Sequence, residues 1–196
     1  MEEAPDFSLR DQHNRDVGLS DFQGKVVALT FLYTYCPEIC PGITETLRKT
    51  ADLLDDEAAE QVQLLAVSVD PERDTVEAAF NYSRDTGLHD RWRFLVGTRE
   101  ELEPVWKAYW LDPSVDTSVG YQIVHLHDDG DLHLHDVDDG SGASTGDIKV
   151  VREGPLISHS APVFLVDREG NRRVLLNDLA LDPAPLVHDL RILLDE

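Results

Sequence analysis

The stretch FLYTYCPEICPG, residues 31–42, contains both cysteines of the chain, Cys36 and Cys40, and a proline follows each of them. It overlaps an apolar run at 26–34, VVALTFLYT, whose β-branched and aromatic residues predict a central strand buried on both faces. The segment 41–61 then has helical periodicity, with Pro41 suited to the first turn. The cysteine pair is therefore expected between a buried strand and a helix.

Predicted strands and helices alternate along the rest of the chain. Strands are expected at 62–70, 92–98 and, as a strand–turn–strand unit, 161–176, and helices at 71–87, 99–110 and 183–196. We expect Asp74 to cap the helix at 71–87 and Pro104 to interrupt the helix at 99–110. This order predicts an α/β fold with a central mixed β-sheet flanked by helices. A cysteine pair after the first buried strand narrows it to a thioredoxin-like fold.

The length of 196 residues fits one domain, 1–196, with an inserted histidine-rich β-hairpin and loop at about 120–150. The chain has 17 Lys and Arg against 39 Asp and Glu, which gives a formal net charge of −22. Such a surface predicts halophilic behaviour, because molar salt shortens the Debye length to about 3 Å. The alternative is an acidic surface that serves only solubility.

The composition also excludes several classes of protein. Nucleic acid is not expected as a partner, because backbone phosphates are bound by Lys and Arg. No apolar run reaches transmembrane length, and the opening MEEAPDFSL does not resemble a signal peptide. We therefore expect a protein that is soluble as given, with any membrane attachment made through an anchor absent from this chain.

Cys36 and Cys40 allow three kinds of chemistry. They can form a redox disulfide, bind a soft metal ion, or be two buried thiols without a role. The positive end of the following helix is expected to lower the thiol pKa values and to favour thiolate. Two thiolates favour Cu(I) or Zn(II) but require further ligands.

The further ligand is sought among the eight histidines. His159 differs from the others by its setting, just before the strand at 161–176, since the loop before this strand faces the cysteines in thioredoxin-like folds. His188 lies in the last predicted helix, and His13 and His89 have no partner in sequence.

Four motifs occur in order along nearly the whole chain: FLYTYCPEICP, SVDPERDT, FLVGTREELEPVWKAY and SHSAPVFLVDREGN. Together they resemble the Sco/SenC family of copper proteins. The resemblance implies a thioredoxin-like domain that binds one copper ion, Cu(I) or Cu(II), through Cys36, Cys40 and His159. The chain departs from the family pattern at Glu38 and Ser158, where the family often has Asp. Ser158 precedes His159, so the orientation of the imidazole is expected to differ.

The resemblance also implies a function, a partner and a location. The function is a metallochaperone that delivers copper to the binuclear copper site of cytochrome c oxidase, or reduces its thiols. The partner is the copper-bearing oxidase subunit or another copper chaperone, on the outer face of the cytoplasmic membrane. The alternative is an enzyme, a thiol–disulfide oxidoreductase with Cys36 and Cys40 as its catalytic redox pair and copper incidental. For SVDPERDT we prefer a structural role, with Pro71 and Asp74 shaping a turn.

The stretch VHLHDDGDLHLHD, residues 124–136, is a candidate for a second metal site, although we prefer to interpret it as a solvated polar face. Its histidines alternate with apolar residues, which is the period of a strand. A hairpin loop with an odd number of residues pairs His127 with His133 and His125 with His135, and puts all four on one face. They could then bind Cu(II) or Zn(II); the alternative is a solvated face without metal.

Overall fold

The computed structural model describes residues 2–37, 39–116, 122–126, 132–136, 149–154, 156–177 and 182–196. Its main sheet has six strands in the order β1-β13-β12-β4-β5-β6. They span Glu2–Glu3 (β1), Asn171–Leu176 (β13), Val163–Val166 (β12), Val26–Leu32 (β4), Val62–Ser68 (β5) and Trp92–Leu95 (β6). Strands β4, β5 and β6 are parallel, whereas β12 is antiparallel to β4. The sheet is therefore mixed, as predicted.

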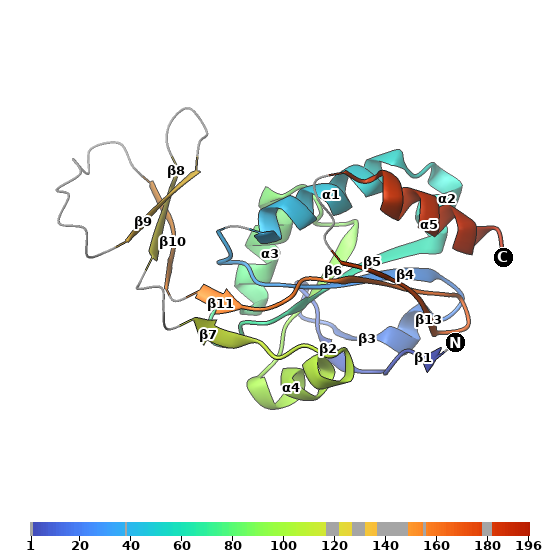
Figure 1. The fold of residues 1–196 in the computed structure, drawn as a ribbon, viewed down its shortest axis with the longest axis horizontal. Coiled ribbons are helices and arrows are strands. Elements are labelled where there is room, and N and C mark those ends of the chain that lie inside the picture. The colour runs from blue at the N-terminus through green and yellow to red at the C-terminus, as the bar shows by residue number, and fades with distance from the viewer. Residues whose placement is uncertain are drawn as a thin grey trace.

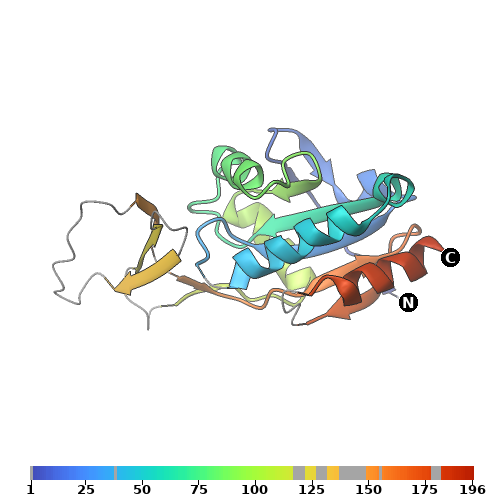
Figure 2. The same ribbon diagram turned by 90° about the horizontal axis from the view of Figure 1, so that it is seen from above.

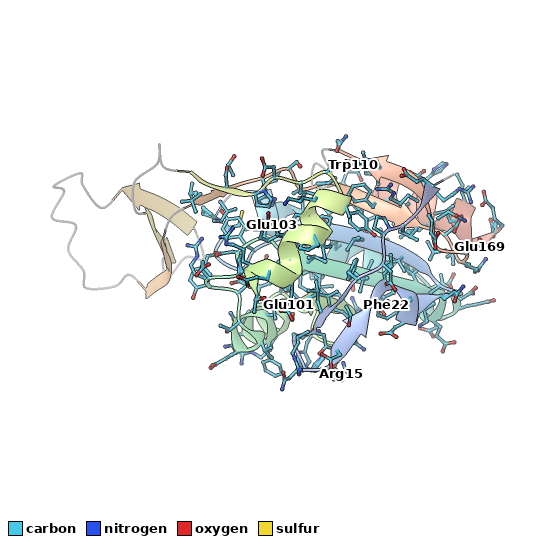
Figure 3. The ribbon with its side chains drawn as sticks, turned by 90° about the horizontal axis from the view of Figure 1, so that it is seen from below. Arg15, Phe22, Glu101, Glu103, Trp110 and Glu169 are labelled. Atoms are coloured by element: carbon cyan, nitrogen blue, oxygen red, sulfur yellow. The ribbon has the colours of Figure 1, made fainter. Side chains whose placement is uncertain are left out.

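Strand β4 lies inside the sheet, and all seven of its residues are buried. This confirms the prediction for the apolar run. Helix α1 (Ile39–Leu53) follows β4, and α5 (Ala184–Leu194) packs beside it over the same face of the sheet (Figure 1). Helix α3 (Val76–Asp85) joins α1 through a 2.8 Å hydrogen bond between the hydroxyls of Thr44 and Tyr82. The opposite face is covered by α4 (Arg99–Ala108), which lies nearest the viewer in Figure 3.

Three local predictions about the helices are wrong. The helix predicted over 41–61 is divided into α1 and α2 (Asp56–Gln61), because Asp55 caps α2 by accepting a hydrogen bond from the amide of Ala58. Helix α3 is capped by Thr75 and not by Asp74. Pro104 lies within the continuous helix α4, where the carbonyl of exposed Glu100, left without its amide partner, can bind water.

The N-terminal segment forms a hairpin of β2 (Ser8–Arg10) and β3 (Asp16–Gly18), followed by a short 3₁₀ helix at Leu19–Phe22. Strand β1 pairs with β13 at the edge of the main sheet, which the sequence did not predict. Strands β7 (Ser114–Asp116) and β11 (Leu156–Ser158) form a second small ladder.

The histidine-rich insertion contains β8 (Gln122–Leu126), β9 (Leu132–Asp136) and β10 (Lys149–Gly154) in the order β10-β8-β9. They lie beyond β7 and β11, away from the main sheet (Figures 1 and 2). The predicted hairpin is present, but its register is two residues from the prediction: His125 pairs with His133, and His135 pairs with Ile123. The innermost pair is Leu126 with Leu132, whereas the prediction paired His127 with His133. His127 lies outside the described residues.

Within the described part of the chain, the structure has no helix long and apolar enough to cross a membrane.

Candidate metal centre

The two cysteines lie where β4 gives way to α1, as the sequence predicted. Cys36 lies in the loop after β4, and Cys40 is the second residue of α1. The amide of Cys40 donates a hydrogen bond to the sulfur of Cys36 at 3.3 Å. Cys36 is 3% exposed and Cys40 is fully buried, and no disulfide joins them. The pair therefore forms one corner of the fold, with one amide of the first helical turn, that of Cys40, directed at the sulfur of Cys36.

His159 reaches this corner from the other end of the chain. Because β12 is antiparallel to β4, with Val163 paired to Thr30, the segment before β12 lies beside the end of β4. Thr30 strengthens this pairing by donating its hydroxyl hydrogen to the carbonyl of Pro162 at 2.9 Å. Nε2 of His159 consequently lies 3.9 Å from the sulfur of Cys40.

The tautomer of His159 is set by its neighbour. Nδ1 donates a hydrogen bond to the carbonyl of Ser160 at 2.8 Å, which leaves the lone pair of Nε2 facing Cys40. Burial lowers the pKa of His159, although the hydrogen bond to Ser160 opposes this effect. A neutral imidazole with a free Nε2 is the form that binds metal ions. The sequence predicted a different orientation of the imidazole, because Ser158 stands where the family often has Asp. In the structure, the backbone carbonyl of Ser160 orients the His159 ring.

The pKa of the Cys40 thiol differs from the expectation. Burial raises this pKa well above its usual value, and the neighbouring sulfur of Cys36 adds to the effect. Desolvation at this fully buried position therefore outweighs the favourable field of the helix end. In the metal-free protein the Cys40 thiol keeps its proton at neutral pH, and a metal ion that binds there must displace it.

Tyr33 connects the cysteine loop to the strand that leads to His159. Its hydroxyl accepts a hydrogen bond from the amide of Ile157 at 3.2 Å, and its ring packs edge-on against His159, with centroids 5.6 Å apart. Burial raises the pKa of this phenol, so it remains neutral. Arg73 lies over the rings of Tyr33 and Tyr35 and forms an ion pair with Asp70.

Asp74 stabilises the loop that carries Cys36 through hydrogen bonds with Thr34. Its buried carboxylate accepts hydrogen bonds from the amide and hydroxyl of Thr34, at 3.0 and 2.7 Å, and from the hydroxyl of Ser68, at 2.6 Å. Burial raises the pKa of Asp74 to about 6, although these three hydrogen bonds oppose the shift. The motif SVDPERDT thus has a structural role, as we preferred, but it acts by tying the end of β5 to the cysteine loop. The sequence could not identify Thr34 and Tyr33 as part of the site.

A cleft of about 200 Å³ opens beside the cysteines. It is lined by the cysteine loop and by β11, and it includes Cys36, Ile39 and His159. The side chain of Ile39 is half exposed at its rim. Cys36 and His159 are therefore the members of the group that a partner molecule can approach. Glu38, the residue between the cysteines that departs from the family pattern, lies outside the described residues.

Comparison with known proteins gives a consistent family. The family model described as SCO1/SenC matches residues 1–128, well over half of the chain but not the part that contains His159. The mitochondrial SCO2 homolog of Bos taurus is 41% identical over 105 residues, which cover 53% of this chain and 39% of that protein. The chain therefore spans about two fifths of the length of this relative.

Solved structures match over nearly the whole chain. Apo Sco1 protein from Thermus thermophilus has a TM-score of 0.71 and 28% identity, covering 98% of this chain and 91% of that one. ScoI of Bradyrhizobium japonicum, solved with copper bound, has a TM-score of 0.66 and 24% identity, covering 97% and 99%. The thioredoxin-like α/β fold predicted from the sequence is confirmed by these similarities.

Proposed function

Because the chain belongs to the SCO1/SenC family, we propose that it is a copper-binding protein that holds one copper ion through Cys36, Cys40 and His159. The observation that supports this most is the position of Nε2 of His159, 3.9 Å from the sulfur of Cys40. Two thiolates and one imidazole form a trigonal donor set that suits Cu(I). Cu(II) can be held by the same set with an added weak ligand.

We further propose that the copper is cargo, delivered to the binuclear copper site of cytochrome c oxidase. The partner is then the copper-bearing subunit of the oxidase, or another copper chaperone that loads this protein. The cleft beside Cys36 supports this proposal, because a receiving thiolate can reach copper from that side. In its natural form the protein would act on the outer face of the cytoplasmic membrane.

The same dithiol supports a second function, thiol–disulfide oxidoreductase. In that reaction Cys36 and Cys40 are oxidised to a disulfide while a disulfide of the partner is reduced to two thiols. Neither cysteine is in a disulfide in this structure, and Cys36 lines the cleft. Thiol reduction leaves the pair as a disulfide, so one molecule of this protein would reduce the partner and a second, reduced molecule would deliver the copper.

One experiment distinguishes the two functions. A soluble copper-binding fragment of the oxidase subunit is prepared with its cysteines either reduced and metal-free or oxidised to a disulfide. If copper delivery is the function, copper-loaded protein transfers its metal to the reduced fragment, as followed by the fragment's visible absorption. If thiol reduction is the function, metal-free protein reduces the oxidised fragment, as counted by alkylation of new thiols. Absence of both reactions would contradict both proposals.

A further inference from the structure

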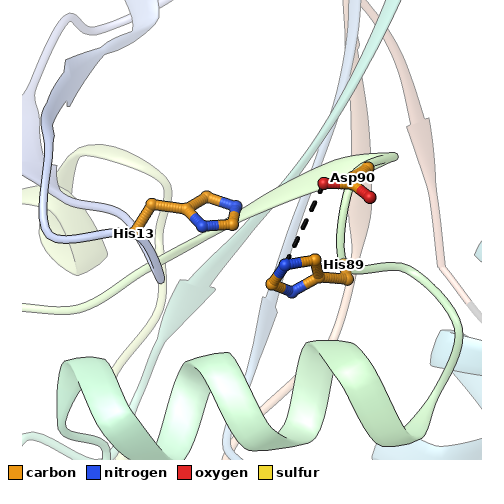
Figure 4. A group of neighbouring side chains, drawn as sticks. All are labelled: His13, His89 and Asp90. Carbon is orange, nitrogen blue, oxygen red and sulfur yellow. Dashed lines mark ion pairs between the residues drawn. The ribbon is translucent and has the colours of Figure 1, made fainter.

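Two histidines that have no partner in sequence meet in space. His13 lies in the loop between β2 and β3, and His89 lies before β6. Their rings are 4.7 Å apart, centroid to centroid, and Nε2 of His89 is 4.0 Å from a carboxylate oxygen of Asp90 (Figure 4). One donor atom from each of the three residues lies within 4.8 Å of the other two. Among the described residues this is the one group of three with that spacing.

Buried hydrogen bonds fix the two segments relative to each other. Gln12, beside His13 in sequence and 1% exposed, donates from its amide nitrogen to the carbonyls of His89 and Trp92, at 3.1 and 3.0 Å. Its amide oxygen accepts a 2.9 Å hydrogen bond from the backbone of Phe94. The positions of His13 and His89 are therefore set by the fold before any ligand arrives, which reduces the ordering cost of binding.

The loop that carries His13 is held in the same way. The buried carboxylate of Asp11 accepts hydrogen bonds from the amides of His13 and Arg15, both at 2.9 Å, and forms an ion pair with the Arg15 guanidinium. Phe80 packs edge-on against both imidazoles, with centroids 6.1 Å from His13 and 4.7 Å from His89. The side chain of Phe80 is thus an apolar packing partner for both imidazole rings.

The imidazole of His89 has a ring nitrogen that no hydrogen bond from the described residues satisfies. Its Nδ1 is buried and has no hydrogen-bond partner in the part of the chain that the structure describes. Its Nε2 faces Asp90, whose side chain is 90% exposed and free to move toward a ligand. Without a ligand, the proton is therefore better placed on Nε2, toward Asp90, than on the buried Nδ1. Moving it to Nδ1 leaves the lone pair of Nε2 to bind a metal ion beside that carboxylate.

We propose that His13, His89 and Asp90 form a second metal site, for a divalent ion of the class that imidazole binds well. Two imidazoles and one carboxylate suit Cu(II) and Zn(II), with water in the remaining positions. By the general order of affinities, Cu(II) binds more tightly than Zn(II). The site lacks thiolate, so it does not suit Cu(I).

This second site is separate from the cysteine centre. His89 and Asp90 precede β6, whereas Cys36 follows β4, and the strands β4, β5 and β6 are parallel. The two groups therefore lie at opposite ends of the sheet. A single chain can then hold a thiolate-bound ion at one end and a divalent ion at the other.

The test begins from a variant without the other candidate ligands. It carries Cys36→Ser and Cys40→Ser, with His125, His127, His133 and His135 changed to alanine. Calorimetric titration with Cu(II) or Zn(II) alone should give one ion per chain. Electron paramagnetic resonance of the Cu(II) form should show coupling to two imidazole nitrogens.

Further substitutions in this background test the ligands. His13→Ala should weaken Cu(II) binding by at least about tenfold and remove one nitrogen from the spectrum, and Asp90→Asn should weaken it less. The matched control is His188→Ala, which removes the histidine of another adjacent His–Asp pair, His188–Asp189, on α5 and should change nothing. Asp90 is exposed and His13 is only partly buried, so both variants should fold, which circular dichroism checks. Unchanged affinity in His13→Ala, or no binding in the starting variant, would overturn the proposal.

Discussion

Nε2 of His159 lies 3.9 Å from the sulfur of Cys40, although the two residues are 119 positions apart in the chain. The antiparallel pairing of β12 with β4 creates this proximity, and the hydrogen bond from Nδ1 to the carbonyl of Ser160 directs the free nitrogen toward the sulfur. Cys40 is fully buried, so a metal ion held between these two atoms is largely shielded from water. If copper binds here as proposed, the cleft beside Cys36 is the side from which a partner can reach it.

The first prediction concerns the contribution of each donor to copper affinity. Changing Cys36 or Cys40 to serine should abolish tight Cu(I) binding, because a hydroxyl does not replace a thiolate as a soft ligand. Losing a group that hydrogen-bonds to a metal ligand typically lowers metal affinity by roughly 10- to 100-fold. His159→Ala removes a proposed ligand itself, so it should weaken Cu(I) binding by more than this. It should also alter the thiolate absorption of the Cu(II) form. Competition with a chromogenic Cu(I) chelator measures both effects.

A suitable control is His188→Ala, which removes an exposed histidine on α5 and should leave Cu(I) affinity unchanged. If His159→Ala binds Cu(I) as tightly as the unaltered protein, His159 is not a ligand.

The sequence predicts the elements that depend on local pattern. All seven residues of β4 are apolar or compact and buried, so the run at 26–34 identifies the central strand without ambiguity. The cysteine pair then marks the end of that strand. Asp74 shows where local pattern fails: Asp74 and Thr75 are both good capping residues. Hydrogen bonds from Thr34 and Ser68 hold Asp74 inward, and Thr75 caps the helix.

The contacts that complete the sites are also long-range. The hydrogen bond from Ile157 to Tyr33, and the meeting of His13 with His89, join segments that have no periodic relationship in sequence. The predicted register of β8 and β9 was wrong by two residues. Register depends on where the first strand ends, and the alternation of histidines and apolar residues does not determine that position.

The second prediction concerns the redox state of the cysteine pair. Mild oxidation should join Cys36 and Cys40 in a disulfide, since the two thiols are neighbours across a single turn. Alkylation should label neither cysteine in the oxidised protein and both after reduction with dithiothreitol. Because the sulfurs cannot serve both as disulfide and as thiolate ligands, the oxidised form should not bind Cu(I) tightly. Tight Cu(I) binding by fully oxidised protein would refute this mutual exclusion.

The third prediction concerns salt. With 39 acidic and 17 basic residues, carboxylates outnumber Lys and Arg by 22, and exposed ion pairs such as Arg48–Asp52 contribute little. Figure 3 shows two of the acidic side chains, Glu101 and Glu103, on α4. Repulsion should therefore dominate, and the melting temperature should rise as sodium chloride is added through the molar range.

Sucrose is the matched control for this measurement, because it stabilises folded proteins by exclusion from their surface without screening charge. The rise in melting temperature should be steepest at low sodium chloride concentration, where screening changes most, and sucrose should not reproduce that shape. A melting temperature that does not respond to sodium chloride would count against the halophilic interpretation.

The fourth prediction concerns Asp74 and pH. Burial raises the pKa of Asp74 from 3.8 to about 6 in the folded protein, so between these values the folded state holds a proton that the unfolded state has released. The contribution of this group to the free energy of unfolding is therefore greatest below about pH 4. It is lost as the pH rises to about 6, by an amount on the order of 3 kcal/mol.

Asp74→Asn should remove this dependence, because the amide does not ionise and its oxygen can still accept the hydrogen bonds from Thr34. Urea unfolding of metal-free protein at pH values from 4 to 7 gives the difference in the free energy of unfolding between the unaltered protein and the variant. The unaltered protein should become less stable relative to the variant as the pH rises through about 6. Asp195→Asn, at the exposed end of the chain, controls for the loss of one carboxylate. A difference that stays constant, or shifts in favour of the unaltered protein with rising pH, would show that Asp74 is already ionised at pH 4 in the folded state and that its hydrogen bonds outweigh its burial.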